Sequence, residues 1–145
     1  MIRRLILISA ATALLAACGA STPERPGSKL TPEEAVAQRA KERWEAIIAR
    51  DYRPAYDRLT PGTRATTTYE AYRQRLLGAA LRWTSAEVQS VECNEPDVCR
   101  AEVYITYMLR GGQPGLGEIE GYNPVFEQWI RSDGQWYYLP GTTGR

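Results

Sequence analysis

Ala101-Glu102-Val103-Tyr104-Ile105-Thr106-Tyr107-Met108-Leu109 is the stretch that decides the fold, because apolar residues alternate there with polar or amphipathic ones. A period of two residues predicts a β-strand that buries one face. The buried face would carry Ala101, Val103, Ile105, Tyr107 and Leu109, with Cys99 extending it. The opposite face would carry Arg100, Glu102, Tyr104, Thr106 and Met108. The stretch therefore predicts a half-buried strand of a sheet.

A second strand is predicted just before this one, at about residues 85–93. Val91 and Cys93 would lie on one of its faces and Val88 on the other, which indicates a bulge or a shifted register. Residues 94–98, Asn-Glu-Pro-Asp-Val, favour a turn. The two strands are therefore expected to form a hairpin.

Cys93 and Cys99 lie at the mouth of this hairpin, and their spacing predicts a disulfide if the chain reaches an oxidising compartment. Metal binding is the alternative, but two thiols are too few ligands and the chain has no histidine to add. A redox pair would need the closer Cys-x-x-Cys spacing. We expect a structural disulfide, and neither a metal nor a cofactor.

The sheet is expected to continue after residue 109. Residues 111–115, Gly-Gly-Gln-Pro-Gly, predict a connection, and a long strand follows through Val125, Phe126, Trp129 and Ile130. Ser132-Asp133-Gly134 predicts a tight turn into a last strand at residues 136–139. Successive hairpins of this kind make an antiparallel meander.

Helical periodicity dominates the chain before these strands. Thr31-Pro32-Glu33-Glu34 forms a capping box, so a helix should begin there and run as far as Arg50. Its apolar face would carry Val36, Ala40, Trp44, Ile47 and Ile48.

Two further helices are predicted before residue 80. A short one should run from Pro54 to Leu59 and end at Thr60-Pro61-Gly62. The other should open near Thr67 or Thr68, with Glu70 placed to complete a capping box with Thr67. Its apolar side would carry Tyr69, Tyr72, Leu76 and Leu77.

Helices followed by a meander predict an α+β domain over residues 31–140, with the N-terminal helices packed on one face of a curved antiparallel sheet. The chain resembles the NTF2-like, cystatin-related α+β cone family. The residues that carry the resemblance are Trp44, Ile47-Ile48, Asp51-Tyr52-x-x-Ala55-Tyr56-x-x-Leu59-Thr60-Pro61-x-x-Arg64 and Trp129-x-x-x-Asp133-Gly134-x-Trp136. The resemblance implies a cone whose wide end can hold a small molecule.

The same resemblance leaves the activity open. Some members of that family are isomerases, dehydratases or epoxide hydrolases that use an Asp or an Asp/His pair, and others only bind ligands or proteins. No catalytic motif of those enzymes can be matched here, and the absence of histidine excludes the Asp/His versions.

The first 17 residues have the layout of a secretory signal. Arg3 and Arg4 precede an apolar stretch over residues 5–17, shorter than the about 20 residues needed to span a bilayer. Leu15-Ala16-Ala17-Cys18 resembles the lipobox of bacterial lipoprotein precursors. The alternative is an ordinary cleavage site at which Cys18 is incidental.

The lipobox resemblance implies cleavage before Cys18, a diacylglyceryl group on its thiol and a fatty acid such as palmitate on its amino group. Gly19 follows, not the Asp that retains enterobacterial lipoproteins at the inner membrane, which implies the outer membrane, facing the periplasm. Residues 18–30 would form a flexible tether and residues 141–145 a C-terminal tail.

Composition excludes several functions. The chain has 145 residues with 18 Lys and Arg against 17 Asp and Glu, so it lacks the basic footprint of a nucleic-acid-binding protein. Without histidine it cannot form a Ser-His-Asp or Cys-His arrangement. We expect no catalytic residue. Asp51 is interpreted as a capping or solvated turn residue, Glu102 as part of an outer sheet face, and Glu118 and Glu120 as solvated carboxylates.

Tyr104, Thr106 and Met108 lie opposite the expected core face and form a candidate interaction face for a second copy or an envelope protein. The leading hypothesis is a lipid-anchored periplasmic protein whose non-catalytic domain binds a partner or itself. The first alternative is a carrier of a small apolar ligand in the cone pocket. The second is an isomerase or hydrolase with a buried carboxylate.

The lipidation hypothesis predicts that Cys18→Ser leaves an uncut or mislocalised precursor, because the acylated thiol would be lost. The measurement is immunoblotting of fractionated membranes beside the wild-type chain. Normal maturation and membrane retention of the variant would contradict lipidation at Cys18.

Overall fold

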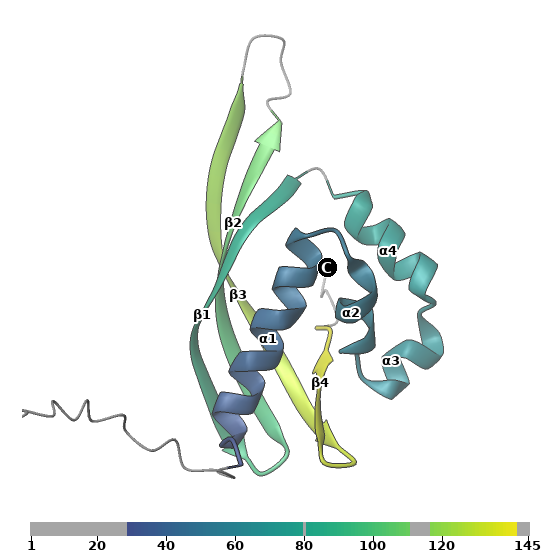
Figure 1. Cartoon of the computed structure of the whole chain (residues 1–145), viewed down its shortest axis with the longest axis vertical. Coiled ribbons are helices and arrows are strands. Elements are labelled where there is room, and N and C mark those ends of the chain that lie inside the picture. The colour runs from purple at the N-terminus through teal and green to yellow at the C-terminus, as the bar shows by residue number, and fades with distance from the viewer. Residues whose placement is uncertain (1–28, 80, 111–116, 142–145) are drawn as a thin grey trace, which may run out of the picture.

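The computed structural model describes residues 29–79, 81–110 and 117–141, and its helices all lie on one side of a curved sheet (Figure 1). The helices are α1 (Pro32–Ile48), α2 (Tyr52–Asp57), α3 (Pro61–Thr66) and α4 (Tyr69–Leu77). The strands are β1 (Leu81–Glu95), β2 (Val98–Arg110), β3 (Glu118–Ser132) and β4 (Gln135–Leu139).

Cys18, the predicted signal, most of the predicted tether and residues 142–145 fall outside the described residues. Within the described part of the chain, no helix has the length and hydrophobicity to cross a membrane.

The sheet is an antiparallel meander in the order β1-β2-β3-β4. Helix α1 lies along β1 and also contacts β2 and β4. The predicted fold class, α+β with helices on a curved antiparallel meander, is therefore confirmed.

The predicted irregularity in β1 is also confirmed as a bulge. Val88 pairs with Val103, whereas Ser90 pairs with Glu102, so Gln89 is an extra residue in the ladder. The extra residue brings Val88 and Val91 to the same side, where both pack against the core. A second bulge lies at Thr84, between the pairs made by Trp83 and Ser85.

Helix α1 begins as predicted. Thr31 and Glu34 make both bonds of the capping box, with the Glu34 amide donating to Thr31 Oγ1 at 3.2 Å and the Thr31 amide to Glu34 Oε2 at 2.8 Å. Its buried face carries Val36, Ala40, Arg43, Trp44 and Ile47. The presence of Arg43 on this face was not predicted.

The predictions for the shorter helices need correction. Helix α2 begins at Tyr52 rather than at Pro54. Thr60-Pro61 does not only end a helix, because Thr60 caps α3 by accepting from the Thr63 amide and Pro61 fills its first turn. Helix α4 is capped by Thr68, which accepts from the Ala71 amide, so the predicted box between Thr67 and Glu70 does not form.

The core lies between α1, α2 and the inner face of the sheet. Its buried apolar members include Trp44, Leu59, Val103, Trp129 and Trp136. Leu77, predicted to lie on the apolar side of α4, is 44% exposed.

The last strand ties the helices to the sheet. The Thr60 amide donates to the Tyr138 carbonyl at 3.0 Å, and the Tyr138 amide donates to the Arg58 carbonyl at 2.7 Å. Leu59 and Tyr138 thus form a short parallel bridge. The predicted turn before β4 is confirmed, since Asp133 and Gly134 have φ values of 51° and 73°, as a type I′ turn requires.

Cys93 and Cys99 form the predicted disulfide across the β1–β2 hairpin. Cys99 is 1% exposed and belongs to the core, so the bond fixes the hairpin end to the inner face. On the chain-entropy model a ring this small contributes about 2–3 kcal/mol.

We expect positions 93 and 99 to resist alkylation in the folded chain until a reductant is added, because both sulfurs are in the bond. Peptide mapping after iodoacetamide treatment, with and without prior reduction, makes the measurement. Labelling of both cysteines without reduction would contradict the disulfide.

Candidate functional site

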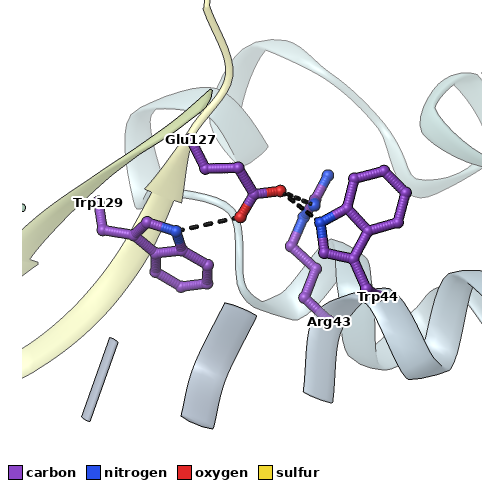
Figure 2. Close-up of polar contacts among 4 residues, drawn as sticks. All are labelled: Arg43, Trp44, Glu127 and Trp129. Atoms are coloured by element: carbon purple, nitrogen blue, oxygen red, sulfur yellow. Dashed lines mark hydrogen bonds and ion pairs between the residues drawn. The ribbon is translucent and has the colours of Figure 1, made fainter. Parts of the chain in front are cut away.

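The interior holds a buried carboxylate that the sequence analysis missed. Glu127 lies on the inner face of β3 and is 1% exposed. It pairs across the ladder with Ala101, whose small side chain leaves room on that face. Glu127 accepts a hydrogen bond from Arg43, one from Trp44 Nε1 at 2.8 Å and one from Trp129 Nε1 at 3.1 Å (Figure 2).

Arg43 is enclosed by aromatic rings as well as by this carboxylate. Its guanidinium lies 3.9 Å from the ring centre of Tyr138 and 5.2 Å from that of Trp44. Burial by itself lowers the pKa of Arg43, but Glu127, with help from Tyr72 and Tyr138, outweighs burial and the net shift is upward. Arg43 is therefore a cation near pH 7.

Two tyrosines complete the surroundings of the pair. Burial raises the pKa of Tyr72 and of Tyr138, although Arg43 opposes the shift in both cases. Both phenols are therefore neutral near pH 7.

This cluster does not have the properties of a catalytic carboxylate. The Glu127 side chain has no exposed surface, and its oxygens are occupied by three donors, one of them cationic. A general base needs a free lone pair within reach of substrate. The cluster therefore acts as a structural link between α1 and β3.

A sequence signal for the pair did exist. Arg43 falls on the apolar face of α1, between Ala40 and Ile47, and Glu127 alternates with Val125 and Trp129 on the inner side of β3. A charge on each of two otherwise apolar faces indicates a buried pair.

Glu127→Gln should lower the free energy of unfolding by about 3–5 kcal/mol, because it leaves the buried Arg43 cation uncompensated. Urea denaturation followed by tryptophan fluorescence measures the change. The matched control is Glu118→Gln, which breaks the exposed pair with Arg82 and should cost less than about 1 kcal/mol. Equal effects of the two substitutions would contradict the structural role of the buried pair.

A cavity of about 410 Å³ opens where α1 and α4 end and β1 begins. Its walls include Ile47, Leu76, Leu81 and Trp83, with Arg50, the residue after the C-cap of α1. None of the described lining residues is acidic. The cavity therefore combines apolar side chains with polar surface, including Arg50 and Arg82, and its described lining offers no carboxylate for catalysis.

The outer face of the sheet is defined here as the face that carries Tyr104, Thr106 and Met108. None of the described helices lies over it (Figure 1). Tyr104 is 41% exposed, whereas Thr106 and Met108 are half-buried. The structure adds two aromatic residues from β3 that were not predicted here: Tyr122, 74% exposed beside Thr106, and Phe126, 54% exposed beside Glu102.

Charged residues around these aromatics are mostly acidic. Glu87 and Glu92 are exposed on β1 and pair across the ladder with Tyr104 and Arg100. Arg100 lies 4.2 Å from the ring centre of Phe126. The outer face is thus both aromatic and predominantly acidic.

The carboxylates considered from the sequence lie at the surface. Asp51 is exposed and makes no capping bond to α2, and Glu118 pairs with Arg82. Glu102 is half-buried on the outer face, with Ser90 Oγ at 3.5 Å, and Glu120 is exposed on β3. In the parts of the chain that the structure describes, no cluster of three or more metal-ligating side chains occurs.

No family model matches the chain, and no curated protein matches it in sequence. Solved structures do share its fold. A SEC-C motif containing protein from Rhodopseudomonas palustris matches with a TM-score of 0.56 at 15% identity, over 74% of this chain and 77% of that one. A SEC-C motif containing protein from Psychrobacter arcticus matches with a TM-score of 0.56 at 12% identity, over 81% of this chain and 65% of that one.

These matches correct the family resemblance stated from the sequence, which is wrong. The proteins of similar structure are SEC-C motif containing proteins, and neither is named as an NTF2-like protein or a lipoprotein. The residues that suggested the resemblance are general to this packing, since Trp44, Trp129 and Trp136 fill the core and Asp133-Gly134 makes the last turn. At such low identities the likeness concerns the fold alone.

Proposed function

We propose that this domain is a non-catalytic binding module that recognises a protein partner, or a second copy of itself, through the outer face of its sheet. The observation that carries the proposal is the exposure of Tyr104, Tyr122 and Phe126 together on a face that α1, α2, α3 and α4 all leave uncovered. Aromatic side chains of this kind supply much of the binding energy at protein interfaces.

The face is a better docking surface than either edge of the sheet. The edge strand β1 has bulges at Thr84 and Gln89. These bulges disrupt the regular hydrogen-bonding pattern that an added strand would need. The edge of β4 is already engaged by the bridge between Leu59 and Tyr138. A partner would therefore bind to side chains rather than extend the sheet.

The charge on the face indicates what such a partner offers. Glu87, Glu92 and Glu95 are exposed on β1 and form no ion pair among the described residues, and Arg100 is engaged with Phe126. A partner segment with lysine or arginine side chains would complement these acids and could stack on the aromatics. Association with such a partner would weaken as salt rises.

The place of action is proposed from residues 1–18 alone. An exported chain held at the envelope through Cys18 would keep the domain within the length of residues 18–30 from the membrane, where the partner would have to lie. The disulfide between Cys93 and Cys99 is consistent with export, because such bonds persist in oxidising compartments.

Photo-crosslinking in the host tests the proposal. A benzoylphenylalanine in place of Tyr122 should give a crosslinked product, and the same probe in place of the exposed Glu45 on α1 should give none. Phe126→Ser should reduce the yield at position 122 at least fivefold without changing the melting temperature by more than about 2 °C, because Phe126 is exposed.

Mass analysis of the product distinguishes a second copy from another protein, and both support the proposal. The outer face would be rejected as a binding surface if crosslinking at position 122 did not exceed that at position 45. It would also be rejected if Phe126→Ser left the yield unchanged.

A further inference from the structure

The cavity at the end of α1 lies on the opposite side of the sheet from the outer face. Its volume of about 410 Å³ falls within the range of small-molecule sites. Helix α4 contributes Leu76 and Leu77, and β1 contributes Leu81 and Trp83. The exposure of Leu77, at 44%, leaves apolar surface at the opening.

The backbone of β1 is distorted at this cavity. Thr84 is the extra residue of the bulge that follows Trp83, and both residues line the cavity. Bulges recur beside binding sites because they redirect side chains without ending the sheet. The wall of the cavity is therefore shaped by an irregular ladder.

Arg50 occupies an unfavourable backbone position at this cavity. It follows the C-cap of α1 with a φ of 61°, in the left-handed region. The Asp51 amide donates to the Ala46 carbonyl at 2.9 Å and the Arg50 amide to the Ile47 carbonyl at 3.1 Å, which is the Schellman pattern. Glycine is the usual residue at this position because a side chain is strained there.

The strained residue places a cation at the cavity. Arg50 lines it, is exposed, and forms no ion pair among the described residues. The other arginine in the lining, Arg82, is already paired with Glu118 at 3.3 Å. Asp51 is exposed and belongs to the lining of a separate depression beside Arg53. The unpaired charge in the described lining of this cavity is therefore positive.

We propose that this cavity binds a single-chain anionic amphiphile, with the alkyl chain between Leu76, Leu77 and Trp83 and the carboxylate or phosphate head group on Arg50. Charge complementarity to Arg50 determines the head group. The tail is determined by the apolar side chains within a lining that is otherwise largely polar. A strained residue that carries the ligand-binding charge fits the general association of backbone strain with binding sites.

The test uses the purified full chain and sodium decanoate below its micellar concentration, with decan-1-ol as the neutral probe of equal chain length. Titrations are followed by NMR and by calorimetry. Decanoate should shift the signals of Trp83 and Thr84 in a saturable manner and should bind at least tenfold more tightly than decan-1-ol. A lysophosphatidylglycerol with one decanoyl chain, titrated in parallel, distinguishes a phosphate head group from a free acid, and tight binding of either supports the site.

Arg50→Gly distinguishes an effect on binding from an effect on stability. The substitution should raise the melting temperature by about 2–5 °C and lower the affinity for decanoate at least tenfold. Arg50→Lys keeps the cation and should retain decanoate affinity within about threefold. Asp133→Gly, at the other described non-glycine residue with positive φ, should leave the affinity unchanged. Leu77→Ser should weaken both decanoate and decan-1-ol.

Two results would overturn the proposal. One is an Arg50→Gly variant that is more stable but binds decanoate as the wild type does, since Arg50 would then not hold the head group. The other is evidence that the cavity does not hold the tail. This would be either saturable decanoate binding that Leu77→Ser leaves unchanged or the lack of any saturable binding.

Discussion

The ion pair between Arg43 and Glu127 is the interaction on which the arrangement of helix and sheet depends. Each charge is buried and is tolerated only because the other is present, so α1 cannot shift along the sheet without exposing both to an apolar interior. The indole N–H groups of Trp44 and Trp129 also fix the orientation of the Glu127 carboxylate, since a hydrogen bond constrains angle as well as distance. Apolar packing alone would permit several positions of α1.

Most of the secondary structure could be predicted, because short stretches of sequence indicate where each helix and strand lies. The alternation at residues 101–109 marks a strand, Thr31 and Glu34 mark a helix start, and the out-of-phase Val88 marks a bulge. The helix that begins at Pro61 was not predicted, because Thr60-Pro61 was interpreted only as the end of the preceding helix. The same two residues can end one helix and begin the next, and the sequence alone does not distinguish the two cases.

The sites could be predicted only in part, because their members are far apart in the chain. The place of Tyr104 on the outer face could be predicted from the alternation of residues in β2. Tyr122 and Phe126 lie on the same face only because of the register between β2 and β3, which the sequence does not reveal. Arg43 and Glu127 each show as a charge on an otherwise apolar face, but their pairing was missed because the two residues lie 84 positions apart in the chain. The family resemblance misled because it rested on residues that fill the core and form the last turn, and such structural roles do not identify a family.

The bridge between Leu59 and Tyr138 has a consequence for the order of folding. The segment between α2 and α3 completes its backbone pairing only with residues at the very end of the described chain. Loop-closure entropy must be overcome before such a contact contributes, so the helices should not settle on the sheet while the chain is still being synthesised. Deletion of β4 is therefore expected to disturb the first helices as much as the last hairpin.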